Sequence, residues 1–321
     1  MSNISMVSVI LAVILALMIF GCEEPEPSIP SIPSGSIIAW GLDDHGQVSN
    51  TPEGDDFIAV SANQKHSLAL RRDGSIAAWG YDSRGQVSDT PAGRGFVAIS
   101  AGYGHNLALH RDGSIVAWGL DMSDMVSNSP AGNDFIAVAA GFNTSMALRG
   151  NGSVFIWGGP YGAGMELEDA DQILYQNNFR DIAINGPLHM GLTDLGQVVT
   201  WGDDQMGSVY DNPLEGTFIG MAAGPRHGVA IAADSSIVAW GWDMRNEVSS
   251  KPVGTGFVSV SVGYSHSLAL HKDGTLTAWG WSRGGHGQLE DTPDDSGYFF
   301  IDAGTYHNIA LRRPDRGQHG E

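Results

Sequence analysis

The sequence predicts an all-β fold, a seven-bladed β-propeller of four-stranded blades. The first observation is a Trp-Gly pair that recurs seven times at spacings of 39, 39, 39, 44, 39 and 39 residues, at Trp40, Trp79, Trp118, Trp157, Trp201, Trp240 and Trp279. Such a period is typical of repeat units that bury their apolar faces against one another. The second observation is a content of 44 glycines and 42% hydrophobic residues, which favours a turn-rich all-β domain.

Residues 1–21 are predicted to be a signal peptide. Met6 to Gly21 is apolar apart from Ser8, and this length suits a signal-peptide core better than a membrane-spanning helix. Gly21 followed by Cys22 resembles the lipobox of bacterial-type lipoproteins, which implies a lipid on Cys22 as the first mature residue. The segment before the run contains no Lys or Arg, so an uncleaved anchor and an ordinary secretory peptide stay open as alternatives.

Residues 22–34 are predicted to be an acidic, Pro-rich tether. Proline favours an extended backbone, so the segment can hold the folded part away from a surface. Cys22 is the single cysteine, which leaves none for a disulfide or a thiolate metal site. We therefore expect an extracytoplasmic protein of the cell envelope, anchored to the membrane through its lipid.

One repeat illustrates how each blade is predicted. In the second unit, the segments 96–102, 105–113 and 114–119 each contain a short alternating or apolar run bounded by Gly, Asp or Asn. Arg111-Asp112-Gly113 between the second and third runs is typical of a tight hairpin. A weaker fourth strand is expected around Gln86, before the loop that begins with Thr90-Pro91. Four short antiparallel strands repeated radially indicate a propeller blade.

The number of blades follows from counting the strand pairs. Inner pairs start near seven aromatic residues, Phe57, Phe96, Phe135, Phe179, Phe218, Phe257 and Phe299. The domain, residues 35–313, begins with an outer pair and ends with an inner pair, so both chain ends are expected to form one composite blade that closes the ring. An open solenoid is the structural alternative. Residues 314–321 are expected to be a disordered tail.

The repeats resemble those of the regulator of chromosome condensation family. The resemblance rests on units such as residues 74–86, with Ala-Trp-Gly, followed by Ala101-Gly-Tyr-Gly-His105-Asn-Leu-Ala-Leu, and it covers residues 35–313. The short unit is similar to the secreted bacterial branch, which includes the propeller-type β-lactamase inhibitor proteins. The resemblance implies seven blades with a two-ended closing blade.

The recurring residues are predicted to be structural. A His occupies one repeat position in six units, with Thr144 as the exception: His66, His105, His189, His227, His266 and His307. A ring of this kind separates its imidazoles instead of gathering them at one metal, so we expect each to hydrogen-bond a neighbouring blade or turn. We expect no cofactor, no metal site and no enzyme activity, because no catalytic motif stands out.

The variable loop residues are the candidate binding site. They gather on one face of the expected ring and comprise Tyr81, Arg84, Tyr103, Phe142, Tyr161, Trp242, Arg245, Tyr264, Trp281, Arg283 and Tyr306, with acidic neighbours such as Asp43, Asp82 and Asp243. Tyr, Trp and Arg often anchor interfaces. The alternative is that these rings pack into the next blade. The opposite face is expected to be more basic, which would permit contact with anionic lipids. The longer fourth unit is either a binding insertion or drift of one repeat.

The predicted function is non-catalytic binding of a protein or peptide by a monomer at the membrane surface. A net charge of −20 excludes nucleic acid as a favoured partner. Inhibition of a secreted enzyme such as a β-lactamase, and guanine-nucleotide exchange as in nuclear members, are alternatives implied by the family resemblance. A glycan-acting enzyme stays open because Asp and Glu are plentiful.

Overall fold

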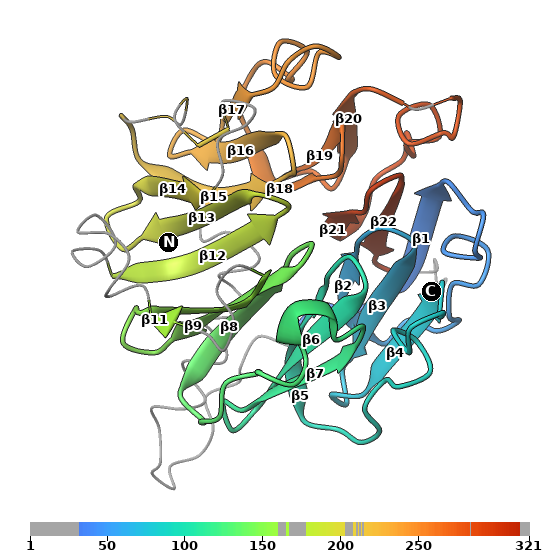
Figure 1. Cartoon of the computed structure of the whole chain (residues 1–321). Helices are drawn as coiled ribbons and strands as arrows, with labels where there is room; N and C mark the ends of the chain where they lie inside the picture. The colour runs from blue at the N-terminus through green and yellow to red at the C-terminus, as the bar shows by residue number, and fades with distance from the viewer. Residues whose placement is uncertain are drawn as a thin grey trace, which may run out of the picture.

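The chain folds into a ring of seven radial β-sheets, as the sequence predicts (Figure 1). The computed structural model describes residues 32–159, 178–202, 208, 209, 211, 213, 215–282 and 284–314, together with the backbone of 165 and 166. The expected signal peptide, most of the tether and residues 315–321 lie outside the described residues. Among those that are described, no helix is long and apolar enough to cross a membrane.

We number the blades from the first complete sheet. Blade 1 is β2 (Phe57–Ala62), β3 (His66–Arg71) and β4 (Ile76–Gly80), and blade 2 is β5 (Phe96–Ala101), β6 (His105–His110) and β7 (Ile115–Gly119). Blade 3 is β8 (Phe135–Ala140), β9 (Thr144–Arg149), β10 (Val154–Gly158) and β11 (Met165–Glu166), and blade 4 is β12 (Phe179–Asn185), β13 (Leu188–Thr193) and β14 (Val198–Gly202). Blade 5 is β15 (Phe218–Ala223), β16 (His227–Ala232) and β17 (Ile237–Gly241), and blade 6 is β18 (Phe257–Val262), β19 (His266–His271) and β20 (Leu276–Gly280). Blade 7 is β21 (Tyr298–Ala303), β22 (His307–Arg312) and β1 (Ser36–Gly41), and the 3-10 turn η1 (Met122–Asp124) follows blade 2.

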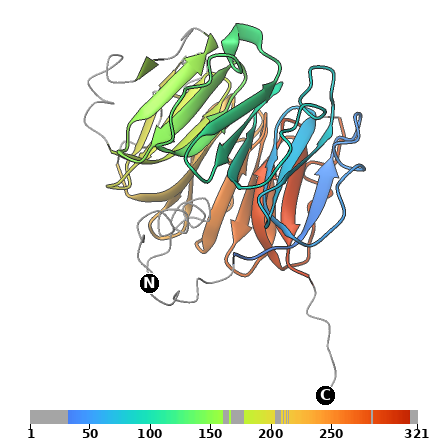
Figure 2. The same cartoon turned by 90° about the horizontal axis from the view of Figure 1, so that it is seen from below.

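Blade 7 closes the ring with strands from both chain ends. β1 pairs with β22 in antiparallel register, from Ser36 opposite Arg312 to Gly41 opposite His307. Figure 2 shows this arrangement from the side, with the blue β1 beside the red strands of the C-terminal end. The predicted composite blade is confirmed, and the open solenoid is excluded.

Within the part of the chain that the structure describes, the predicted fourth strand is wrong for every blade except blade 3. Where it was expected, around Gln47 and its counterparts, the chain forms a closed loop. In blade 7 one carboxylate oxygen of Asp43 accepts hydrogen bonds from the backbone N–H groups of Val48 (2.8 Å) and Ser49 (3.0 Å). Asp82, Asp121 and Asp243 do the same in their repeats. In these four repeats the donors are therefore unavailable to a sheet, and within the described residues the six other blades have three strands each.

The two sets of connections define two faces of the ring. We call the first the loop face: it carries the loops between the first and second strands of each blade and the loops that follow the third strand. Their proximity is direct in blade 1, where the backbone N–H of Tyr81 donates to the carbonyl of Lys65 (2.9 Å). We call the opposite side the turn face, because it carries the tight turns between the second and third strands. In blade 1 that turn places Gly74 at φ +81°, a conformation that L side chains rarely adopt.

Buried histidines connect neighbouring blades. In five blades the His that opens the second strand hydrogen-bonds through Nε2 to the residue after the corresponding position in the next blade. The pairs are His66–Asn106 (2.7 Å), His105–Ser145 (2.8 Å), His227–Ser267 (2.7 Å), His266–Asn308 (2.8 Å) and His307–Ser67 (2.8 Å). The last pair joins the composite blade to blade 1. The expected structural role is confirmed for these five histidines.

His189 does not belong to this series. In blade 1 His66 lies opposite Gly80 and Ser67 opposite Trp79, whereas in blade 4 Leu188 lies opposite Gly202 and His189 opposite Trp201. Leu188 therefore occupies the histidine position, and His189 is one residue further along the strand. The predicted alignment was wrong at this point. The discriminating signal is the separation from the Trp, which is 12 residues here and 13 in the other units.

The tryptophans form a second set of connections between blades. Six of the seven Trp-Gly indoles, all but Trp201, donate their N–H to a backbone carbonyl in the preceding blade's loop, at 2.9–3.2 Å, the acceptors being Gln47, Gln86, Met125, Ser208, Glu247 and Gln288. The Trp side chains of these six units are buried. The predicted packing role of the Trp-Gly pairs is therefore confirmed, since the indole joins the blades and the glycine turns the chain.

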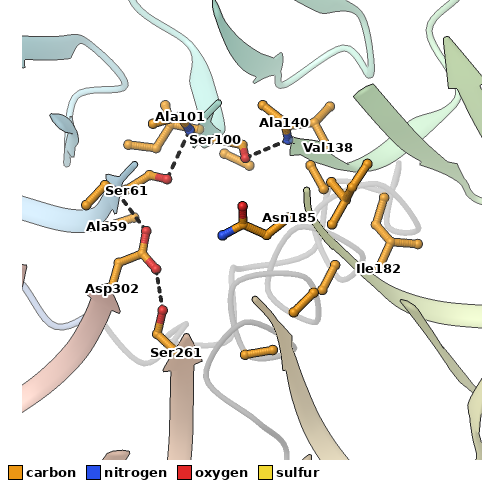
Figure 3. Close-up of a pocket in the computed structure, with 18 of the residues that line it drawn as sticks. Ala59, Ser61, Ser100, Ala101, Val138, Ala140, Ile182, Asn185, Ser261 and Asp302 are labelled. Atoms are coloured by element: carbon orange, nitrogen blue, oxygen red, sulfur yellow. Dashed lines mark hydrogen bonds between the residues drawn. The ribbon is translucent and has the colours of Figure 1, made fainter. Parts of the chain in front are cut away.

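Short side chains connect the inner strands around the central channel (Figure 3). Ser61 accepts the backbone N–H of Ala101 (3.0 Å), and Ser100 accepts that of Ala140 (2.9 Å). At the same position in the other blades, Ser261 bonds Ala303 and Asp302 bonds Ala62, whereas Ala139, Ala183 and Ala222 provide no side-chain acceptor. The connection from blade 3 to blade 4 lacks the His, Trp and inner-strand bonds, and an apolar cluster that includes Ile156, Ile182 and Ile184 fills it.

Amide hydrogen exchange is expected to follow these inner-strand bonds. The N–H of Ala101 has a side-chain acceptor, whereas the equivalent N–H of Ile184 has none, so Ala101 should exchange roughly fivefold to tenfold more slowly, from a net bond of about 1 kcal/mol. Residue-resolved exchange by NMR measures this. Ser61→Ala should speed exchange at Ala101 and leave Ala140 unchanged as the internal control. Equal acceleration at both amides would contradict the assignment.

Candidate functional site

The predicted binding residues lie on the loop face, but they form separate clusters. Tyr103, Phe142, Tyr264 and Tyr306 lie in the loops between the first and second strands, and Tyr81, Trp242 and Trp281 directly follow the third strands. Arg84 and Arg245 are exposed in the loops that follow. Tyr161 and Arg283 lie outside the described residues. No single continuous aromatic patch is formed by the remaining nine.

One cluster joins blades 2 and 3. The rings of Tyr103 and Phe142 have centroids 4.1 Å apart, and the backbone N–H of Tyr103 donates to the carbonyl of Gly141 (3.0 Å). Phe142 remains 49% exposed, which is high for a large apolar side chain. This pair therefore presents an apolar edge to solvent.

A second cluster extends across blades 5, 6 and 7. The guanidinium of Arg226 lies over the ring of Tyr264 at 4.3 Å, and its Nη2 donates to the hydroxyl of that tyrosine (2.7 Å). Tyr264 in turn contacts Tyr306, with centroids 6.0 Å apart. Further from the axis, the guanidinium of Arg245 stacks over Trp281 at 3.5 Å. Two cation–π pairs thus bridge blades 5 and 6.

A third cluster joins blade 7 to blade 1. The ring of His45 contacts that of Tyr81 at 4.6 Å, and Lys65 lies 5.8 Å from the same tyrosine. The Lys65 ammonium is also within 3.4 Å of a carboxylate oxygen of Asp44. The cation of this cluster is therefore neutralised, unlike the arginines of the second cluster.

These contacts combine the two interpretations of the sequence. The aromatic rings do pack onto the next blade, and they also keep partly exposed surfaces on the loop face. Sequence reasoning missed Lys65 and Arg226, although each directly precedes a strand-opening histidine. The signal was available, because Tyr306 occupies the same position in its own repeat and was included.

Several carboxylates of the loop face accept hydrogen bonds from their own loops. Partial burial acts to raise the pKa of Asp43, but hydrogen bonds from the backbone N–H groups of Ser49 and Val48 outweigh it and lower the pKa below its usual value. The same balance holds for Asp82, Asp121 and Asp243. These carboxylates stabilise their own loops, so they offer a partner less than their number suggests.

The turn face does not carry the expected excess of free positive charge. Arg149 pairs with Asp134 (2.7 Å), Arg312 pairs with Asp295 (3.0 Å), and Arg71 pairs with Asp56. Arg72 donates to the carbonyl of Ile32 and the hydroxyl of Ser34, where the chain enters the ring. Of the basic residues expected on this face, Arg111, Lys272 and Arg313 are left without a carboxylate partner among the described residues. Because so few free positive charges are left, we do not propose contact with anionic lipids.

The central channel contains a cavity of about 260 Å³ with one polar side. Asp302, Ser61, Ser100 and Ser261 line that side, and Asn185 points inward from the opposite side (Figure 3). Burial raises the pKa of Asp302, although hydrogen bonds from Ser261 and Ala62 act against it. In the part of the chain that the structure describes, no group of three His, Cys, Asp or Glu side chains could hold a metal ion.

Comparison with protein families identifies the repeat. The model of the regulator of chromosome condensation (RCC1) repeat matches residues 57–86, 96–123, 135–161 and 257–288. These four segments are similar to RCC1 repeats. They extend from the inner strands into the loop that follows the third strand, so the matched segments include the loop-face residues Tyr81, Tyr103 and Tyr264. No protein of curated function matches the chain in a sequence comparison.

Several solved structures have a similar fold. Human WBSCR16 is 14% identical with a TM-score of 0.71, over 87% of this chain and 99% of that one. Prp20p from Saccharomyces cerevisiae, described with its binding to Gsp1p and histones, is 17% identical with a TM-score of 0.67, over 89% and 93% of the two chains. The CRINKLY ectodomain of the Arabidopsis thaliana receptor kinase ACR4 is 19% identical with a TM-score of 0.63, over 80% and 90%. At these identities the similarity establishes the fold alone.

The buried histidines predict loss of stability in mild acid. Burial lowers the pKa of His105, His227 and His307 to about 3 and that of His266 to about 4, and also lowers that of His66. The unfolded chain therefore binds more protons below about pH 6.5, and the free energy of unfolding should fall as the pH falls toward 4. Each histidine contributes up to about 1.4 kcal/mol per pH unit.

Urea unfolding between pH 7.5 and 5 measures this slope. Asp181 opposes this pH dependence in part. Burial raises the pKa of its carboxyl to about 7 despite a hydrogen bond from Ile182, so the contribution of Asp181 to the free energy of unfolding falls as pH rises. The variant His227→Gln removes one buried imidazole. The slope of the free energy of unfolding against pH should then fall by the equivalent of about one proton relative to wild type. An unchanged slope would contradict the neutral, buried state of this imidazole.

Proposed function

We propose that this protein is a non-catalytic propeller that binds a protein or peptide through its loop face. The observation that carries the proposal is the set of aromatic and cation–π contacts that cross between blades on that face and stay partly exposed. Such side chains are already ordered before binding, so less conformational entropy is lost when a partner arrives. A rigid repeat scaffold with variable loops is a common basis for recognition. Prp20p, which has a similar fold, binds protein partners, and this agrees with the proposal.

The proposal includes attachment to a membrane through a lipid on Cys22. The backbone of Gly35 exchanges hydrogen bonds with Phe57, and Arg72 holds Ile32, so the chain enters the ring on the turn face. Nine residues lie between Cys22 and Ile32, and a fully extended chain over this separation reaches at most about 35 Å. A lipid at Cys22 would therefore keep the turn face toward the membrane and the loop face toward the exterior.

Loop-face variants test the binding proposal. We expect the triple variant Tyr103→Ala, Phe142→Ala, Tyr264→Ala to lose at least about tenfold in affinity for the natural partner, because interface aromatics often contribute more than 1.4 kcal/mol each. Affinity capture from native envelopes with quantitative mass spectrometry identifies the partner and compares the variants. The matched control is Arg111→Ala with Lys272→Ala on the turn face. Capture that depends on the control residues and not on the aromatic ones would assign binding to the other face.

Membrane attachment has its own test. Cys22→Ser should move the protein from the membrane to the soluble fraction, since a lipidated cysteine is the proposed anchor. In the anchored protein, a fluorophore on a cysteine introduced at Asp112 of the turn face should transfer energy to a membrane dye more efficiently than one at Asp82 of the loop face. Equal transfer from both positions, or membrane retention of Cys22→Ser, would contradict this arrangement.

A further inference from the structure

Arg226 and Arg245 are two arginines of the loop face that each lie on an aromatic ring and lack a carboxylate partner among the described residues. Arg71, Arg94, Arg149 and Arg312 on the turn face all form ion pairs. Neither Arg226 nor Arg245 forms one with any described residue, although the whole chain carries a net charge of −20. Both arginines lie at the boundary between blades 5 and 6, and no described carboxylate neutralises either of them there.

Both guanidinium groups are held in place by aromatic rings. Arg226 lies over Tyr264 at 4.3 Å and uses one nitrogen, Nη2, to bond the hydroxyl of that ring. Arg245 lies over Trp281 at 3.5 Å. A ring under the face of a guanidinium leaves its N–H edge available, and the stacking reduces the freedom that a ligand would otherwise have to restrict.

The two stacked pairs belong to one seam between blades 5 and 6. Tyr264 and Trp281 are joined through Ser265, whose carbonyl accepts the backbone N–H of Trp281 (2.8 Å). The nearby carboxylates are engaged in their own loop. Asp243 accepts the backbone N–H groups of Val248 and Ser249, and the buried Glu247 accepts that of Arg245 (2.8 Å).

We infer that this seam binds carboxylates of an acidic segment in the protein partner. The planar N–H edge of a guanidinium matches a carboxylate through two parallel hydrogen bonds, and a stacked arginine presents that edge in a fixed direction. The overall negative charge of the chain repels a broadly acidic surface, whereas the two arginines attract carboxylates at close range. A partner with one short acidic segment is therefore favoured over a partner with a broadly acidic surface. This inference rests on the proposed function and specifies the chemistry of its partner.

Peptide selection tests the inference directly. The probe is a random 12-residue peptide library displayed on phage and selected on the immobilised full-length protein, with deep sequencing of the enriched peptides. Peptides from the wild type are expected to be enriched in Asp and Glu. Their affinity should fall about tenfold for Arg226→Gln and for Arg245→Gln, since each change removes one charged hydrogen-bonding group. Arg226→Lys should fall almost as far, because an ammonium keeps the charge and loses the paired geometry.

Arg111→Gln on the turn face is the matched control, because it changes the net charge equally and should leave affinity unaltered. Thermal unfolding verifies that each variant is folded. Selection of neutral or basic peptides through the aromatic residues of the loop face would overturn the inference and leave the proposed function intact. Failure to select any peptide that depends on the loop face would overturn both. Retained affinity in the two Arg→Gln variants, or preference for uronic-acid oligosaccharides over the selected peptides, would also overturn the inference.

Discussion

The ring depends on buried, uncharged imidazoles that connect five of the seven blades to the next. The bond has a defined direction in blade 1: Asn106 donates its amide N–H to the carbonyl of Gln86, so its Oδ1 is left to accept the proton on Nε2 of His66. The equivalent bond, from His307 to Ser67, closes the ring where the two chain ends meet. The composite blade is therefore joined to blade 1 by the same kind of bond that joins four other pairs of neighbouring blades.

The distribution of these bonds also explains where the loop face is ordered. Contacts between rings, or between cations and rings, cross the seams between blades 2 and 3, 5 and 6, 6 and 7, and 7 and 1. Each of these seams has a buried His bond beneath the loops. Between blades 3 and 4 the His position is Thr144 and isoleucines replace the polar connections. The polar connections hold neighbouring loops at fixed separations, which side chains need in order to pair across a seam.

Sequence periodicity predicted the fold because the repeat residues are the ones that join the blades. The count of seven, the composite blade and the structural role of five histidines all follow from spacing. The fourth strand could not be predicted in the same way, because Gln-Val-Ser has strand-like residues while Asp43 or its counterpart takes up their backbone donors. The position of Leu188 was predicted wrongly for a related reason, because the repeats were aligned on their histidines whereas the strand register follows the Trp. The placement of Tyr81 and Tyr264 on one face could be predicted from the repeat. Their division into separate clusters could not, because it depends on neighbours such as Lys65 and Arg226 that differ from blade to blade.

Net charge is a poor guide to what this surface can bind. The carboxylates of Asp43, Asp82, Asp121 and Asp243 accept hydrogen bonds from their own loops, and three arginines of the turn face pair with Asp56, Asp134 and Asp295. A charge that is already paired contributes to the long-range field but offers little to a ligand at contact. What a partner meets at close range is the set of groups that remain unpaired, and near the seam between blades 5 and 6 that set includes two arginines on aromatic rings. The net charge of −20 therefore favours a basic partner, whereas the two arginines favour an acidic one. Specificity depends on these local groups.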